Sequence, residues 1–407
     1  MRYHAGHFQR VCAVSVLQLK KNEDRRLRLG HPWIYSNEVD AAATPLSGFA
    51  PGEQVRVAAH GGKALGMAYV NPHSLIAARL FSREEHVLDR SLLIHRLNIA
   101  LSLRERLFPT PHYRVVHGEA DGLPGLVVDR YGDVLVAQIT TAGMEAVREA
   151  LIEALVKVFK PQGVLLRNDS SSRELEGLSS GVELAYGEVG EQVELVENGA
   201  RFQVRPWDGQ KTGWFYDQAD NRARLPRYVQ GKRVLDLFSY MGGWGVQALR
   251  HGASEAVCVD ASALALQQCR INADLNEVGE RLNTLEGDVF DALKDLRDAR
   301  ERFDVVICDP PAFIKRRKDA AAGLEAYRRV NQMAMQVMAR DGVLFSCSCS
   351  HHLPREKLPE LMWAAARHVD RSMQILEFGH QSADHPVHPA IPETDYLKAV
   401  VARILPT

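Results

Sequence analysis

Acidic residues stand within or directly after short apolar runs at three places in the C-terminal half of the chain. These residues are Asp236, Asp260 and Asp288. A glycine-rich turn at Gly242 to Gly245 follows the first run, where the backbone can approach a ligand and begin a helix whose first N–H groups point at it. A carboxylate at Asp260 can accept both ribose hydroxyls of an adenosine, and Asp288 can accept from an adenine amino group. The pattern predicts a site for an adenosine-containing cofactor.

A fourth apolar run ends in Asp309, Pro310 and Pro311. The two prolines remove backbone donors and stiffen the turn, so Asp309 is expected at the mouth of the site. A carboxylate or its backbone at that place can hydrogen-bond the edge of a planar base.

Two cysteines, Cys347 and Cys349, alternate with serines at the end of a fifth apolar run. A reactive thiol needs a partly exposed, polar setting, which the exit of a strand provides. Spacing alone does not choose between them, because alternate residues of a strand face the same side. The adjacent histidines lack a second ligand set, so no metal site is expected. The other cysteines are expected to be inert small hydrophobes: Cys12, Cys258, Cys269 and Cys308.

The elements that must position these groups are read from the apolar runs themselves. Runs at 233–238, 256–260, 303–309 and 342–346 are each followed by a helical stretch. This alternation predicts a doubly wound parallel α/β sheet over residues 187–407. Ligands of such sheets bind beyond the carboxyl ends of the strands, where the acidic residues and cysteines would meet.

The first part of the chain has a different texture. From about residue 11 to 81 the chain shows period-2 alternation broken by Gly and Pro, including a strand-like stretch at 11–19, which predicts a small β-barrel or sandwich as a domain over residues 1–85. A basic run with nearby aromatics is compatible with an RNA-facing surface or with a merely solvated one: Lys20, Lys21 and Arg25. Residues 86–186 read as an α+β middle domain, in which the polar cluster at 167–177 is expected to be a structural network.

Composition limits the function classes. The chain has 407 residues, of which 46% are apolar, and 50 basic residues against 51 acidic ones give a net charge of −1. This balance excludes nucleic-acid binding by bulk charge but allows local basic patches. No apolar run is long enough for a membrane helix. Six cysteines without CxxC spacing argue against a disulfide scaffold and a structural zinc site, so a cytoplasmic setting is expected.

Four segments together resemble one family. They are 211–222 (KTGWFYDQADNR), 236–245 (DLFSYMGGWG), 309–313 (DPPAF) and 348–350 (SCS). In this order they resemble the bacterial ribosomal RNA large-subunit methyltransferases of the RlmI type, which make 5-methylcytosine in 23S rRNA. The resemblance implies a PUA domain at 1–85, the middle domain at 86–186 and a Rossmann-like class I methyltransferase domain at 187–407.

The resemblance also implies roles for individual residues. The cofactor would be S-adenosylmethionine, with Asp260 at its ribose and Asp288 at its adenine. Cys349 aligns with the family's nucleophile, and Asp309 would serve N3 of the cytosine. No cysteine follows Pro310-Pro311, so the base that removes the C5 proton is not identified. The remaining cofactor contacts would be Gln218, Asn221, Asp236, Phe238 and Gly242. The remaining RNA contacts would be Pro310, Pro311, Phe313, Lys315, Arg316 and Arg317, although a flexible solvated loop would also explain the last three.

The expected partner is therefore 23S rRNA or a large-subunit assembly intermediate, with no membrane and no metal, and a homodimer is compatible with the sequence. Three other functions stay open. One is methylation of a guanine nitrogen by the same architecture, which needs no thiol. Another is a nicotinamide-dependent oxidoreductase, because Gly243, Gly245 and Ala248 satisfy a loose G-x-G-x-x-A pattern. The third is a non-catalytic RNA-binding factor.

Overall fold

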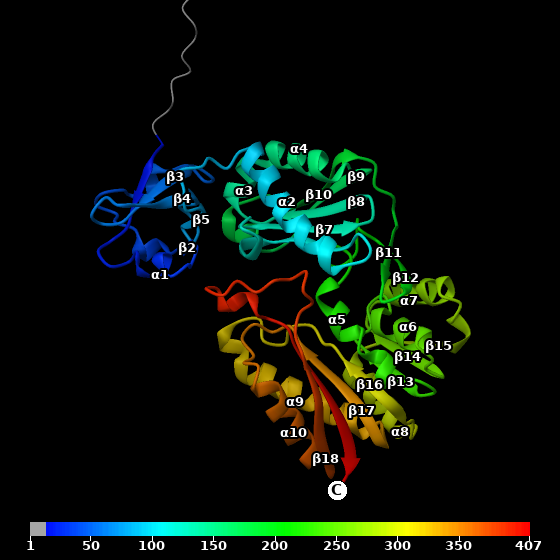
Figure 1. Ribbon diagram of the computed structural model, residues 1–407. Coiled ribbons are helices and arrows are strands. Elements are labelled where there is room, and N and C mark those ends of the chain that lie inside the picture. The colour runs from blue at the N-terminus through cyan, green and yellow to red at the C-terminus, as the bar shows by residue number, and fades with distance from the viewer. Residues whose placement is uncertain (1–13) are drawn as a thin grey trace, which may run out of the picture.

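The computed structural model describes residues 14–407, and Figure 1 shows their arrangement. Cys12 and the first residues of the expected strand at 11–19 lie outside the described part. A five-stranded sheet begins the described chain, in the order β1-β3-β4-β5-β2. Its strands are β1 (Val16–Gln18), β2 (Trp33–Ile34), β3 (Gln54–Ala58), β4 (Ala64–Val70) and β5 (Ala78–Ser82), with the short helix α1 (Arg25–Arg28). Alternating residues of β3, such as Val55 and Val57, are buried in its core, as the period-2 pattern predicts.

A second five-stranded sheet follows, in the order β10-β9-β8-β7-β6. Its strands are β6 (His112–His117), β7 (Leu126–Tyr131), β8 (Val134–Ile139), β9 (Gly163–Asn168) and β10 (Gly181–Gly187). Its helices are α2 (Arg90–Leu107), α3 (Ala142–Ala146) and α4 (Arg148–Phe159). Asp89 starts α2, because its side chain accepts a hydrogen bond from the backbone N–H of Leu92.

The polar cluster at 167–177 joins the three parts of the chain. Arg167 donates to the backbone oxygens of Pro206 and Gly209, which lie beyond the second sheet. Glu176 accepts from the side chain of Asn71, in the N-terminal part. The expectation of a structural network is therefore confirmed, and the network has the added effect of fixing the parts relative to one another.

The C-terminal part is a seven-stranded sheet in the order β15-β14-β13-β16-β17-β19-β18, preceded by the hairpin β11 (Val193–Glu197) and β12 (Ala200–Val204). Its strands are β13 (Arg233–Leu237), β14 (Glu255–Asp260), β15 (Leu282–Glu286), β16 (Phe303–Cys308), β17 (Met338–Ser348), β18 (Arg371–Gly379) and β19 (Lys398–Pro406). The helices include α5 (Ala219–Arg222), α6 (Gly243–Arg250), α7 (Ala263–Leu275), α8 (Val289–Asp298), α9 (Ala320–Gln336) and α10 (Lys357–His368). Separate hydrophobic clusters lie on the two faces of the sheet, so both faces are covered, as in a doubly wound fold.

The expectation of a parallel sheet holds for the direction of six of the seven strands and is wrong for β19 alone. β19 runs antiparallel to β17, and β18 runs antiparallel to β19. The chain passes from β18 to β19 through residues 380–397 without a crossover helix, and antiparallel neighbours do not need one.

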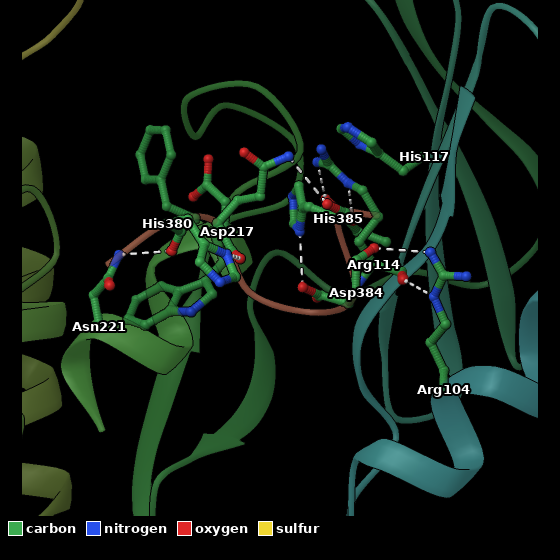
Figure 2. Close-up of polar contacts among 12 residues, drawn as sticks. Arg104, Arg114, His117, Asp217, Asn221, His380, Asp384 and His385 are labelled. Atoms are coloured by element: carbon green, nitrogen blue, oxygen red, sulfur yellow. Dashed lines mark hydrogen bonds and ion pairs between the residues drawn. The ribbon is translucent and has the colours of Figure 1, made fainter. Parts of the chain in front are cut away.

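Residues 380–397, here called the C-terminal crossing segment, reach from the seven-stranded sheet to the middle part of the chain (Figure 1). Arg104 of α2 donates to the backbone oxygen of Asp384 at 2.8 Å, and the backbone N–H of Arg114 donates to the Asp384 carboxylate at 2.8 Å. Figure 2 shows this contact, with Arg104 and Arg114 on one side and Asp217 and Asn221 on the other. Arg104 also pairs with Asp121 and is fully buried. The segment is therefore held by charge-assisted hydrogen bonds at the boundary.

Candidate active site

A cavity of about 560 Å³ opens beyond the carboxyl ends of β13, β14, β16 and β17. The sequence predicts its candidate residues at this edge of the sheet. Phe238, which follows β13, and Cys349, which follows β17, both line the cavity. Residues from far along the chain complete its wall, among them Lys211, Asp217 and Tyr396.

The turn after β13 forms one side of the cavity. Phe238 and Tyr240 both have positive φ, 61° and 48°, a conformation that non-glycine residues adopt at a cost. The backbone N–H of Tyr240 donates to the carboxylate of Asp260 at 2.9 Å, which holds the turn against the end of β14. Phe238 and Asp260 both line the cavity, as expected for cofactor contacts.

The end of β15 supplies the next part of the wall. Asp288 lines the cavity and caps α8, since its carboxylate accepts from the backbone N–H of Phe290 at 2.8 Å. Gly287 lies beside it with φ 155°, and a Cβ there would meet no atom within 4 Å. The wall is therefore open at this point.

Three expected cofactor residues lie behind the cavity wall rather than on it. Asp236 is fully buried, and its Oδ2 accepts from the backbone N–H of Gly245 at 2.9 Å, so it holds the first turn of α6. Gly242 precedes α6 with φ 82°, and a side chain there would collide with Cys269. Asn221 donates to the side chain of Gln218 at 2.7 Å and to the backbone of His380. All three are buried, and direct contact with a ligand stays a prediction for these residues.

Burial raises the pKa of Asp236 to about 8, and nearby Asp309 and Asp260 act in the same direction. Asp236 thus carries a proton at neutral pH. Its Oδ1 is buried without a hydrogen-bond partner among the described residues.

Asp309 follows β16, which lies on one side of β13 in the sheet, whereas Asp260 ends β14, which lies on the other side. One carboxylate oxygen accepts from Gln218 at 2.8 Å and the other from the indole of Trp244 at 3.0 Å. Burial, together with the nearby Asp217, raises the pKa of Asp309 to about 6, although the two hydrogen bonds oppose the rise. The group can therefore exchange a proton close to neutral pH.

The structure distinguishes the two candidate cysteines. Cys349 lines the cavity, with its Sγ 4.0 Å from the backbone oxygen of Pro310. Cys347 is fully buried in the core beneath it, which corrects the expectation that both leave the core. Burial raises the pKa of the Cys349 thiol to about 11, and the ammonium group of Lys211 acts against this rise. Cys258, Cys269 and Cys308 are buried as expected.

The expected RNA contacts divide into two groups. Pro310 and Pro311 line the cavity, whereas Phe313 packs against Tyr327 at 4.9 Å between ring centres and does not line it. The ring of Phe313 is partly buried against the hydrophobic cluster beside the site, and an RNA contact at this residue stays a prediction. The basic residues are exposed, on the loop after the Pro-Pro turn and on the N-terminal part: Lys315, Arg316, Arg317, Lys20, Lys21 and Arg25.

Sequence reasoning missed Lys211, Asp217 and Tyr396 as cavity residues. Asp217 accepts a hydrogen bond from the hydroxyl of Tyr396 at 2.7 Å. The segment 211–222 was singled out by its similarity to a family, which was the only signal for Lys211 and Asp217. Tyr396 had none, because it reaches the site through the fold of the C-terminal crossing segment.

Residues 14–407 contain neither a candidate metal site nor a candidate membrane span. No group of three or more His, Cys, Asp or Glu side chains is placed to hold a metal ion. No helix has the length and apolar character needed to cross a membrane.

Comparison with known proteins identifies the class. Residues 173–403 match the family model for S-adenosylmethionine-dependent methyltransferases, and residues 17–83 match that for PUA-like domains. Two solved structures share the fold over 96% of this chain and 100% of theirs: SMU.776 complexed with SAH (TM-score 0.81, 21% identity) and a protein from Streptococcus mutans (TM-score 0.80, 20% identity). The fold and the site thus define an S-adenosylmethionine-dependent methyltransferase with a PUA-like N-terminal domain.

The curated relatives narrow this class. Ribosomal RNA large subunit methyltransferase I of Aliivibrio fischeri is 37% identical over 396 residues, covering 96% of this chain and 99% of the relative. The protein of the same name from Vibrio cholerae is 36% identical over 397 residues, with the same coverage. The chain belongs to the ribosomal RNA large subunit methyltransferase I family. The match does not favour the nicotinamide-dependent oxidoreductase or the non-catalytic factor.

Proposed function

We propose that this protein methylates C5 of a cytosine in 23S ribosomal RNA through a covalent adduct between Cys349 and C6 of the base. The observation that carries the proposal is that Cys349 and Asp309 line the same cavity as Asp260 and Asp288. A nucleophile, a proton donor and a set of acceptors suited to an adenosine thus meet at one sheet edge. Methylation of a guanine nitrogen would leave the accessible thiol without a role.

The cavity residues suit S-adenosylmethionine. Asp260 would accept from the ribose hydroxyls, Asp288 from the adenine amino group, and Phe238 would lie against the adenosine. The unpartnered Oδ1 of protonated Asp236 and the first turn of α6 would support the methionine part from behind. S-adenosylmethionine supplies an electrophilic methyl group.

The chemistry at the base follows from two residues. C5 of cytosine is a weak nucleophile until a thiolate adds to C6, which makes C5 enamine-like. Burial keeps the pKa of the Cys349 thiol at about 11, so the thiol would give its proton to the Asp309 carboxylate as it attacks, and the charge of Lys211 would stabilise the thiolate that forms. Asp309, with a pKa of about 6, would donate a proton to N3 as Sγ bonds to C6 and so neutralise the charge that develops on the ring.

Access to the cavity requires an unpaired base. The cytosine must be flipped out of a helix or already be single-stranded. We assign RNA binding to the PUA-like domain, with Lys20, Lys21 and Arg25, and to the exposed residues Lys315, Arg316 and Arg317 beside the cavity mouth. The substrate would be 23S rRNA or a large-subunit assembly intermediate, which places the enzyme in the cytoplasm.

The test compares Cys349→Ala with Cys347→Ala as a matched control. Both variants are incubated with S-adenosylmethionine and unmodified 23S rRNA, and the digested RNA is analysed for methylated nucleosides. We expect Cys349→Ala to bind the cofactor and transfer no methyl group, and Cys347→Ala to form 5-methylcytosine. Full activity of Cys349→Ala, or a methylated guanine as the product, would overturn the proposal.

A further inference from the structure

The covalent mechanism needs one more group, which must remove the proton from C5 after that atom has been methylated. The cavity is lined by four carboxylates, and three of them are already engaged. Asp260 and Asp288 accept hydrogen bonds from backbone N–H groups at the ends of β14 and β15. Both oxygens of Asp309 accept hydrogen bonds, one from Gln218 and one from Trp244. The fourth carboxylate is Asp217.

Asp217 differs from the others because one of its oxygens is buried and yet has no hydrogen-bond partner among the described residues. Its Oδ2 accepts from the hydroxyl of Tyr396 at 2.7 Å. Its Oδ1 is buried and has no hydrogen-bond partner among the described residues. Leaving a buried carboxylate oxygen unpaired is costly, so such a group in a cavity indicates an oxygen kept available for a ligand.

The position of Asp217 is fixed from both sides. It lies in the turn Tyr216–Gln218, next to the residue that hydrogen-bonds Asp309. Its backbone oxygen accepts from the backbone N–H of Ser382 at 2.8 Å, which ties it to the C-terminal crossing segment. Figure 2 shows Asp217 between Asn221 on one side and Asp384 and His385 of the crossing segment on the other.

The charge state of Asp217 suits a proton acceptor. Burial alone would raise its pKa, but the neighbouring His385, Lys211 and the hydrogen bond from Tyr396 outweigh this effect and lower it. Asp217 is therefore ionised at neutral pH.

We propose that Asp217 is the catalytic base that removes the C5 proton, and that Tyr396 is the residue that positions it. The inference rests on the proposed covalent mechanism. In this step Oδ1 of Asp217 takes the proton from C5, and the C5–H electron pair forms the C5=C6 double bond. The C6–S bond breaks with its electrons passing to Cys349, and the proton on N3 returns to Asp309. The products are the 5-methylcytosine base, a thiolate and a protonated Asp217.

The test is Asp217→Asn, which keeps the size of the side chain and removes its basicity. Enzyme in excess is mixed with ¹⁴C-methyl S-adenosylmethionine and a 23S rRNA transcript carrying tritium at C5 of its cytosines. We expect one methyl group to be transferred per RNA molecule, tritium release to slow by on the order of 100-fold or more, and an SDS-resistant enzyme–RNA adduct to accumulate. The matched control is Asp220→Asn, an exposed carboxylate in the following helix, which should behave like wild type.

Two results would overturn the inference. One is tritium release by Asp217→Asn at the wild-type rate per methyl group transferred. The other is loss of methyl transfer without any adduct although the cofactor still binds, which would make Asp217 a binding or structural residue.

If Asp217→Asn does not fold, as judged by S-adenosylhomocysteine binding, Tyr396→Phe decides the matter. It keeps the carboxylate but removes the group that orients it, so slower tritium release and a detectable adduct support the inference, and wild-type kinetics overturn it. The reaction of wild-type enzyme with RNA containing 5-fluorocytosine tests the covalent mechanism separately from the role of Asp217. Absence of an adduct there refutes the covalent mechanism itself, whereas its presence confines any failure to the role of Asp217.

Discussion

The raised pKa of Asp309 leads to a prediction about stability that has the opposite sign to that of an ordinary acidic residue. The pKa rises from 3.8 to about 6, chiefly through burial. A carboxyl group whose folded pKa is raised destabilises the fold when it ionises. The cost begins near pH 3.8, grows through pH 6 and is constant above it. A shift of about 2 units corresponds to about 3 kcal/mol at pH 8.

Asp309→Asn should remove this cost, because the amide is neutral in both states. Its oxygen can still accept one of the two hydrogen bonds from Gln218 and Trp244, and loss of the other costs about 1 kcal/mol. We therefore expect the variant to be more stable than wild type by about 2 kcal/mol at pH 8. At pH 4.5 the ionisation cost has fallen to about 1 kcal/mol, so the two proteins should be nearly equal.

The assay is urea unfolding followed by tryptophan fluorescence at pH 8 and pH 4.5, since Trp214 and Trp244 report on the methyltransferase domain. Asp295→Asn, an exposed acidic residue of α8, is the control and should show no comparable pH-dependent gain. A stability difference between Asp309→Asn and wild type that is the same at both pH values would refute the reasoning. Methyl transfer by Asp309→Asn should fall by on the order of 100-fold, because N3 loses its proton donor.

Two further predictions concern the boundary between domains and the RNA surface. Arg104→Met should lower the free energy of unfolding by about 3–5 kcal/mol, because it leaves Asp121 buried without its partner and releases the backbone of Asp384. Exposed Arg106→Met on the same helix is the control, and equal unfolding curves for the two variants would contradict this role. Replacing three exposed basic residues by alanine should reduce the slope of log K against log salt for RNA binding by about 2, while cofactor binding stays unchanged. The three residues replaced are Lys315, Arg316 and Arg317, and exposed Lys157→Ala is the control. If the slope of the triple variant equals that of the control, these three residues do not contact the RNA.

The sequence correctly predicted which carboxylates lie together at the carboxyl ends of the parallel strands. Asp260, Asp288 and Asp309 reach one cavity because parallel strands bring their carboxyl ends to the same edge of a sheet. A buried parallel strand is a short apolar run that needs no partner nearby in the chain, so it can be read locally. The antiparallel direction of β19 was missed, because an apolar run does not encode which way it enters the sheet.

Burial was the property that the sequence could not supply. Cys347 and Cys349 have the same local pattern, and only the depth of the strand end separates the buried thiol from the accessible one. Asp236 belongs to a recognisable motif, yet its contact is with the first turn of α6 rather than with the cavity. Tyr396 reaches Asp217 through long-range packing of the C-terminal crossing segment, for which no local pattern exists.

The measurement that tests the covalent mechanism most directly is the reaction of wild-type enzyme with S-adenosylmethionine and 23S rRNA in which cytosine is replaced by 5-fluorocytosine. Elimination requires the C5 substituent to leave without its bonding electrons, which hydrogen does as a proton and fluorine cannot do, so the reaction should stop at the adduct. We predict an SDS-resistant complex in which mass spectrometry finds the methylated base bonded to the peptide containing Cys349. The complex should be absent with Cys349→Ala and present with Cys347→Ala. Formation of no adduct by wild type, or an adduct on any residue other than Cys349, would contradict the account.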